Sequence, residues 1–293
     1  GAFSDTLDKL PTNSVDAVSL SLVDALHTLP RHLNLRGCRF DYNALFEVGP
    51  ERLATLRRLY ADDARAKFSV RRGSGRVPSL LSPNNWAQFA ALTSVDELSM
   101  AHNEPDEWAV DGEVCFPPSL TVLDMAQSEI DRHELADLVL AIARSCPALT
   151  HLRLDNCGLD VESIRPRLVC DLLAALPSLA KLSMDRCGIG EATVVALTEA
   201  LPTPGFCPSL QVLSLVGNSV PLAWIQALVR AAASHPSLRL IKLQSNRYLL
   251  PSNVPAVLPP GAHPGIYGAL GVYNFHHHDS DGDDDDDDNT AAP

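Results

Sequence analysis

The sequence has few cysteines, and none of them stands in the spacing of a zinc ribbon or a disulfide framework. Seven cysteines occur in 293 residues, and no C-x-x-C motif is present. Zinc ribbons need closely spaced ligand pairs, and disulfide-stapled domains are short chains with an even cysteine count. We therefore expect a reducing compartment, and neither a metal centre nor any other cofactor.

Long apolar runs are also missing. No segment approaches the roughly 18 to 20 consecutive apolar residues that cross a membrane. The stretch from Gly1 to Pro30 contains Asp5, Asp8, Asp16 and Asp24, so it lacks the apolar core of a signal peptide. We expect an intracellular protein located in the cytoplasm, with the nucleus, the cytoskeleton and the mitochondrion as alternatives.

Negative charge is concentrated at one end of the chain. The formal net charge is −13, but eight of the 36 acidic residues are aspartates between positions 279 and 288, and the rest of the chain carries only −5. Like charges at that density repel one another. Residues 279–293 are therefore predicted to form an acidic tail that stays unfolded unless a cationic partner binds it.

A short pattern recurs along the middle of the chain. Leu149, Leu152, Leu154, Cys157 and Leu159 form one copy, and further copies begin at the residues Leu120, Leu179, Leu210 and Leu238, with partial copies near Leu33 and Val95. The second apolar position of the copies recurs at a nearly fixed interval, at 98, 123, 152, 182, 213 and 241. Such an interval has room for one strand and one helix, so the period predicts a stack of strand-and-helix units.

The spacing within one copy predicts which side chains are buried. Residues two apart on a strand point to the same side, so Leu152 and Leu154 enter a core while His151, Arg153 and Asp155 face outward. Strands are predicted at 97–101, 122–126, 151–155, 181–185, 212–216 and 240–244. Helical periodicity follows between the strands, and a proline ends each helical segment, at positions 147, 177, 208 and 236.

The pattern L-x-x-L-x-L-x-x-N/C-x-L resembles the leucine-rich-repeat family, and its long repeats are most similar to the ribonuclease-inhibitor-like branch. The resemblance covers residues 30–250. It implies an α/β solenoid with a curved parallel sheet on the concave side and helices on the convex side. It also implies a structural ladder of side chains that bind turn backbone, at the positions Cys38, Asn103, Cys157, Cys187, Asn218 and Asn246.

Departures from the period divide the chain further. Leu53, Leu56 and Leu59 are spaced as on a helix, and a basic insertion is predicted at about 61–78. Residues 1–29 are read as an N-terminal cap, because the end of a solenoid would otherwise expose its core. Residues 251–278 form a proline-rich segment that is predicted to be extended, although Gly268 to Phe275 carries enough apolar surface to dock locally.

Two surfaces are candidates for binding a partner. The concave face would present His151, Arg153, Asp155, Lys181, Asp185 and Lys242, and solenoids commonly bind proteins on such a face. The insertion concentrates cationic side chains that suit a phosphate backbone, an acidic protein surface or the acidic tail itself, and these are Arg65, Lys67, Arg71, Arg72 and Arg76. A protein partner is favoured over nucleic acid.

The sequence also contains residues typical of three other kinds of site. His151, Asp155 and Ser183 lie on neighbouring predicted strands, but no nucleophile elbow or oxyanion loop accompanies them, so we expect no enzyme. The run from His277 to Asp288 imitates a calcium loop with the wrong first and last ligands, and is read as a solvated tail. Cys157 and Cys187 are near enough for a disulfide, but asparagine replaces them in the next two repeats, which favours reduced thiols.

These features predict a non-enzymatic scaffold or accessory subunit that binds one or more proteins of a larger assembly, with no membrane and no small-molecule substrate. Two alternatives stay open. The long repeats and acidic tail are similar to those of the leucine-rich-repeat activators of the small GTPase Ran, although that family's catalytic loop does not map onto this sequence. The tail also resembles that of acidic leucine-rich nuclear proteins, which implies a chaperone of histones or other basic proteins.

Overall fold

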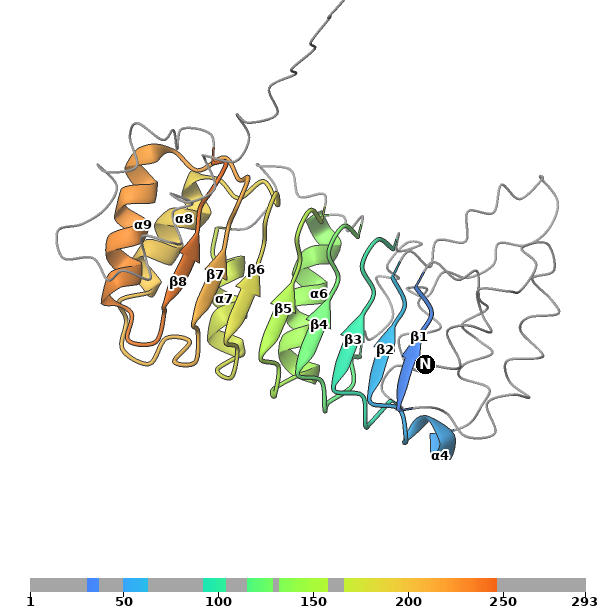
Figure 1. Ribbon diagram of the computed structural model, residues 1–293. Helices are drawn as coiled ribbons and strands as arrows, with labels where there is room; N and C mark the ends of the chain where they lie inside the picture. Colours follow the sequence, from blue (N-terminus) through green and yellow to red (C-terminus); the bar gives the residue numbers. More distant parts are fainter. Residues whose placement is uncertain are drawn as a thin grey trace, which may run out of the picture.

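A computed structural model of the chain describes residues 31–36, 50–62, 92–103, 115–128, 132–157 and 166–246. In these residues the fold is α/β, with one open sheet of eight parallel strands that follow one another in chain order (Figure 1). The strands are β1 (His32–Asn34), β2 (Arg58–Tyr60), β3 (Glu97–Ser99), β4 (Val122–Asp124), β5 (His151–Arg153), β6 (Lys181–Ser183), β7 (Val212–Ser214) and β8 (Leu240–Lys242). This arrangement is compatible with a solenoid-like α/β fold.

One buried residue lies at the centre of every strand, and these residues are in register across the whole sheet. They are Leu33, Leu59, Leu98, Leu123, Leu152, Leu182, Leu213 and Ile241. We number each repeat from this residue as position 0. A second buried residue stands at position +2, as the alternation of a strand requires. Position 0 and position +2 together supply the core face of the sheet.

The six predicted strands are confirmed as parallel neighbours, although each ends earlier than predicted, at position +1. The backbone pairing nevertheless continues beyond them. The amide of Leu154 donates to the carbonyl of Ser183 at 2.9 Å, and that of Asn156 donates to Asp185 at 2.7 Å. The residue at position +4 then takes a left-handed conformation, with φ between 54° and 69° in the six repeats from β3 to β8. This turn ends each strand and directs the chain away from the sheet.

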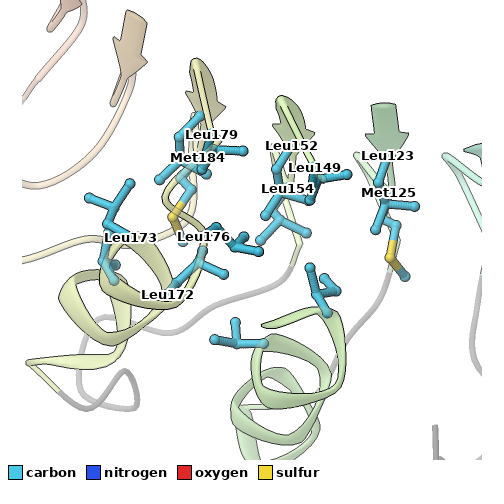
Figure 2. Close-up of a cluster of buried hydrophobic side chains, with 14 of the residues drawn as sticks. Leu123, Met125, Leu149, Leu152, Leu154, Leu172, Leu173, Leu176, Leu179 and Met184 are labelled. Carbon is cyan, nitrogen blue, oxygen red and sulfur yellow. The ribbon is translucent and has the colours of Figure 1, made fainter. Parts of the chain in front are cut away.

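Helices cover one face of the sheet (Figure 1). Besides the short α4 (Pro50–Leu53), which lies below the end of β1 in this view, they are α6 (Arg132–Ser145), α7 (Leu168–Ala175), α8 (Glu191–Ala200) and α9 (Leu222–Ser234). The last four pack side by side in chain order. Figure 2 shows the layer between the sheet and α7, where Leu152 and Leu154 of the β5 repeat approach Leu172 and Leu176. All four side chains are at most 2% exposed.

The interpretation of Leu53, Leu56 and Leu59 as one helix face is wrong beyond Leu53. Helix α4 ends at Leu53, and Leu59 is the centre of β2, which pairs with β1 and β3. Position +2 of this repeat is Ala61, which is fully buried. Because alanine stands where the other repeats have leucine or methionine, the pattern was hidden. Residues 61 and 62 thus belong to the sheet framework, and 63–78 of the predicted insertion lie outside the described residues.

Candidate interaction surface on the open face of the sheet

No described helix covers the second face of the sheet, which we call the open face. It consists of the side chains at positions −1, +1 and +3, because these point away from the core. The resemblance predicts that this face is concave and holds a partner. Its described members from β5 to β8 are His151, Arg153, Asp155, Lys181, Ser183, Asp185, Val212, Ser214, Val216, Leu240, Lys242 and Gln244.

Aspartates at position +3 are bonded to the next strand. One carboxylate oxygen of Asp155 accepts hydrogen bonds from the hydroxyl of Ser183 at 2.6 Å and from the amide of Asp185 at 2.9 Å. Asp185 repeats this with Ser214 at 2.6 Å and the amide of Val216 at 2.8 Å. We call this the Asp–Ser ladder. It ties three successive strands together at the edge where they leave the sheet.

A third copy of the Asp–Ser ladder joins β2 to β3. Asp62 accepts the hydroxyl of Ser99 and the amide of Ala101, the latter at 3.1 Å. Every described serine at position +1 therefore follows an aspartate at position +3 of the preceding repeat. Sequence reasoning missed this relation, although comparing consecutive repeats at these two positions would have found it.

Asp155 is predicted to face outward and to bind a partner, and the structure shows how little of it is accessible. Its side chain lies within the Asp–Ser ladder, and the residue is only 8% exposed. Asp185 is partly exposed, and burial raises its pKa although Ser214 and the amide of Val216 oppose that shift. The two aspartates thus serve mainly to hold neighbouring strands in register.

Ion pairs match the arginines on the open face of the first five strands. Arg153 contacts Asp155 at 2.5 Å and Asp124 at 3.3 Å, and its hydrogen bond to Asp155 is the main reason that its pKa is raised. Arg58 pairs with Glu97 at 3.1 Å. These arginines remain about half exposed at 52% and 47%, but their charges are already matched.

Arg36 is matched in the same way at the first strands. Its guanidinium pairs with Asp62 and lies over the ring of Tyr60, 4.8 Å from the ring centroid. A planar cation against an aromatic face is a favourable arrangement. As in the Asp–Ser ladder, the residue at position +3 of one repeat contacts the residue at position +1 of the next. Here the contact is between a guanidinium and an aromatic ring, and not between a carboxylate and a hydroxyl.

The last three strands carry cations of another kind. Lys181 and Lys242 are exposed, and neither has a carboxylate within 4.0 Å among the described residues. Val212 and Leu240, at position −1, are partly exposed, as is Val216 at position +3. We call these five residues the C-terminal strip. It combines apolar surface with lysines that make no described ion pair, which we call unmatched, although the charge of Lys242 acts on Asp185 and opposes the rise in its pKa.

His151 contacts its neighbour in sequence and no acid. Its Nδ1 lies 2.8 Å from the hydroxyl of Thr150, and burial together with the nearby Lys181 lowers its pKa. Ser183 donates directly to Asp155, and no described hydrogen bond joins either of them to His151. The order of nucleophile, base and orienting acid that a catalytic triad needs is therefore not formed here.

A second ladder runs along the turns that follow the strands, and it contains the predicted positions. In the repeats from β3 to β8, the side chain at position +5 donates to the carbonyl at position +2 of the preceding repeat. The pairs are Asn103 to Ala61 at 3.0 Å, Ser128 to Met100 at 3.2 Å, Cys157 to Met125 at 3.3 Å, Cys187 to Leu154 at 2.9 Å, Asn218 to Met184 at 3.0 Å and Asn246 to Leu215 at 2.9 Å. We call this the turn ladder.

Asparagine does more in the turn ladder than cysteine. The side-chain oxygen of Asn218 also accepts the amides of Cys187 and Ile189, both at 3.0 Å. Cys157 and Cys187 are free thiols. Burial raises the pKa of Cys187 to about 12 and raises that of Cys157 as well, so both stay protonated and able to donate.

Several predicted site residues lie outside the described residues. They are Cys38 of the turn ladder and the basic residues Arg65, Lys67, Arg71, Arg72 and Arg76. The N-terminal cap, the proline-rich segment and the acidic tail lie there too. Among the residues that are described, no group of histidine, cysteine and carboxylate side chains could hold a metal ion, and no helix has the length and apolar character to cross a membrane.

Neither a protein-family model nor a curated protein matches the sequence.

Proposed function

We propose that the chain is a leucine-rich-repeat protein of the ribonuclease-inhibitor-like kind, and that its open face holds another protein. It acts as a scaffold or accessory subunit of a larger intracellular assembly, and carries out no reaction of its own. The observation that carries the proposal is the C-terminal strip, where unmatched lysines flank apolar side chains on a rigid sheet.

Support for the repeat family comes from positions 0, +2 and +5. Leucine, methionine or isoleucine fills positions 0 and +2 in seven of the eight strands, with Ala61 as the exception. Asparagine, cysteine or serine donates from position +5 in every described repeat from β3 to β8. These are the positions at which the family's pattern requires such residues.

Rigidity is what makes the open face suited to binding. Both ladders and the backbone pairing hold in place the backbone that carries these side chains before a partner arrives, so little backbone conformational entropy is lost on association. Lys181 and Lys242 have no described carboxylate to give up, so a partner's acidic groups can approach them without displacing an existing pair. The partly exposed Val212 and Leu240 add apolar area that water leaves on contact.

A partner with carboxylates beside apolar side chains therefore fits the C-terminal strip best. The basic residues between Arg65 and Arg76 would supply a second, longer-range attraction for the same acidic partner. The Ran-type and histone-chaperone alternatives remain predictions, which stimulated GTP hydrolysis and salt-sensitive binding of core histones, respectively, would test.

A paired substitution tests the surface. Lys181→Glu with Lys242→Glu reverses both unmatched charges, whereas Arg167→Glu with Arg230→Glu makes the same change of charge at exposed positions on the helical side. Each tagged full-length variant would be expressed in cells that naturally contain the chain, cross-linked and purified, with bound proteins quantified by mass spectrometry. We expect the first pair to lose a set of proteins that the second pair retains.

The opposite pattern would overturn the assignment. If the variant on the helical side loses the partners while the lysine variant retains them, the helices and not the open face hold the partner. Equal retention by both variants would equally remove the C-terminal strip from the binding surface.

A further inference from the structure

Strand β8 ends the described sheet, and its outer edge carries polar groups that the other strands use for pairing. The amides at positions +2 and +4 of β7 donate to β8, from Leu215 to Lys242 at 2.9 Å and from Gly217 to Gln244 at 2.8 Å. Leu243 and Ser245 occupy these positions in β8. Their amides donate to no residue that the structure describes.

Gln244 marks the same edge with a side-chain acceptor. It stands at position +3, where Asp62, Asp155 and Asp185 each accept the position +3 amide of the next strand, at 2.8 to 3.1 Å. The Oε1 atom of Gln244 is buried and has no hydrogen-bond partner. A buried amide oxygen without a donor is unfavourable and rare in folded proteins. The edge thus has an acceptor placed for the amide of a further strand.

The chain beyond β8 contains one segment with the spacing of a repeat. Among the strand centres from β3 to β8, the shortest interval runs from Leu98 to Leu123 and the longest from Leu182 to Leu213. Counted from Ile241, the centre of β8, these two intervals place the next strand centre between positions 266 and 272. Each copy of the pattern begins with an apolar residue at position −3, as Leu149 does before Leu152. Within the window, only a strand centred on Leu270 has large apolar residues at positions −3, 0 and +2, which are Tyr267, Leu270 and Val272. Leu270 follows Ile241 at the same interval at which Leu152 follows Leu123.

We infer that residues 269–273 of this chain pair with β8 as a ninth parallel strand, centred on Leu270. The amide of Tyr273 then donates to Oε1 of Gln244, as the amide of Asp185 donates to Asp155. The amide of Ala269 donates to the carbonyl of Arg239, as those of Val212 and Leu240 donate to the preceding strand at 3.0 Å. This docking is independent of what the open face binds.

Side-chain size agrees with that register. In the Asp–Ser ladder, the short aspartate meets a serine at position +1 of the next strand. Gln244 is one methylene longer than aspartate, and position +1 of the inferred strand is Gly271, which has no side chain. The longer acceptor therefore has room to reach the backbone where a serine would obstruct it.

The register predicts an alternating pattern of amide protection. On a parallel strand, successive amides point to opposite sides. The amides of Ala269, Gly271 and Tyr273 face β8, whereas those of Leu270, Val272 and Asn274 face away. Residue-resolved hydrogen exchange on the full chain should show the first set exchanging at least about tenfold more slowly than the second.

Proline substitutions give a matched pair for the same experiment. Tyr273→Pro removes the amide that Gln244 accepts, while Asn274→Pro removes one that faces away. We expect Tyr273→Pro to abolish the protection of Gly271, and Asn274→Pro to preserve it. Gln244→Leu should weaken protection at Tyr273 without affecting the amide of Leu154, which reports that the rest of the sheet is folded.

Three results would each overturn the inference. Fast, uniform exchange from 269 to 274 in the unmodified chain would mean that no ninth strand forms. Equal effects of the two proline substitutions would mean that the register is wrong. Protection of the Leu243 and Ser245 amides without protection at 269–273 would mean that another polypeptide, or another segment, pairs with β8.

Discussion

The two ends of the open face differ in how their charges are balanced. From β1 to β5 the arginines Arg36, Arg58 and Arg153 are each paired with a carboxylate, whereas Lys181 and Lys242 on β6 and β8 have no such partner among the described residues. Matched charges on a surface hold the sheet together but offer little to a partner, because a new contact must displace an old one. Unmatched charges beside apolar groups can bind a partner without first breaking an existing ion pair.

The difference follows from which residue types face each other in neighbouring repeats. An aspartate at position +3 is satisfied by a serine at position +1 of the next repeat, so it does not remain as a free anion. Where position +3 is apolar, as at Ala126 and Val216, the next repeat has a charged residue at position +1, which is Arg153 or Lys242. Arg153 pairs with Asp124 on the preceding strand, whereas Lys242 faces Ser214 and reaches Asp185 only through a longer-range attraction, without a described ion pair.

The largest expected effect comes from breaking the core that both ends share. Leu182→Asp places a carboxylate at position 0 of β6, where the side chain is 1% exposed. A buried charge without a partner should reduce the free energy of unfolding by more than about 3 kcal/mol. Chemical denaturation followed by circular dichroism would measure this, with Lys181→Asp on the neighbouring exposed position as control.

A loss of similar size in both variants would show that the register of β6 is wrong. We expect Lys181→Asp to change the free energy of unfolding by less than about 0.5 kcal/mol, because the site is exposed and makes no described ion pair. The comparison of the two ends depends on this register, since a shift by one residue would exchange the open face for the core.

A second, smaller effect should separate the matched end from the unmatched end. Asp155→Ala removes the acceptor for Ser183 and for the amide of Asp185, and it also removes one partner of Arg153. We expect a loss of about 1 to 3 kcal/mol in the free energy of unfolding, because buried donors are left unpaired. Asp155→Asn keeps the accepting oxygen and should recover much of that loss.

Lys242→Ala is the counterpart at the unmatched end. It should leave the free energy of unfolding within about 0.5 kcal/mol of the parent value, since no described bond is lost. If Lys242→Ala destabilises the chain as much as Asp155→Ala does, then Lys242 has a structural partner and the contrast between the ends fails.

Much of the fold could be predicted from the sequence, because positions 0 and +2 are filled by large apolar residues at a nearly constant interval. Strand β2 could not, since Ala61 weakens its pattern and the interval from Leu59 to Leu98 is longer than any between the later strands. A single alanine is enough to hide so short a strand. The pairing of β2 with β1 and β3, and not the composition of β2 itself, makes this segment a strand.

The open face was less predictable, because outward position does not determine exposure. Asp155 points away from the core and is nevertheless buried by Ser183 and Arg153. Which carboxylate an arginine contacts depends on residues a whole repeat away in the chain, and these become neighbours only in the sheet. The turn ladder was easier, since its bonds always run from position +5 to the same carbonyl of the preceding repeat.

A third prediction concerns that regularity. Cys187→Asn should change the free energy of unfolding by less than about 1 kcal/mol, because asparagine can donate to the carbonyl of Leu154 as Asn218 does to Met184. Cys187→Val keeps the volume but removes the donor, and should be the less stable of the two. Thermal unfolding of both variants would rank them, and the reverse order would mean that packing, and not the hydrogen bond, decides this position.

The smallest effect is a shift in the titration of His151, and it tests whether Lys181 really is an unmatched cation. Burial and the nearby Lys181 both lower the pKa of His151 below its ordinary value of 6.5. The unfolded chain therefore binds a proton more readily than the folded chain. The stability that the neutral imidazole contributes is present above pH 6.5 and declines as the pH falls from 6.5 through the folded pKa.

Lys181→Met removes the cation while keeping the aliphatic stem, so the pKa of His151 should rise towards 6.5, and the rise should shrink with added salt. Titration of the His151 ring protons by NMR would measure the shift, with Lys242→Met, two strands further along the sheet, as the matched control. A pKa that Lys181→Met leaves unchanged would mean that another group neutralises Lys181, and the C-terminal strip would then be balanced like the rest of the open face.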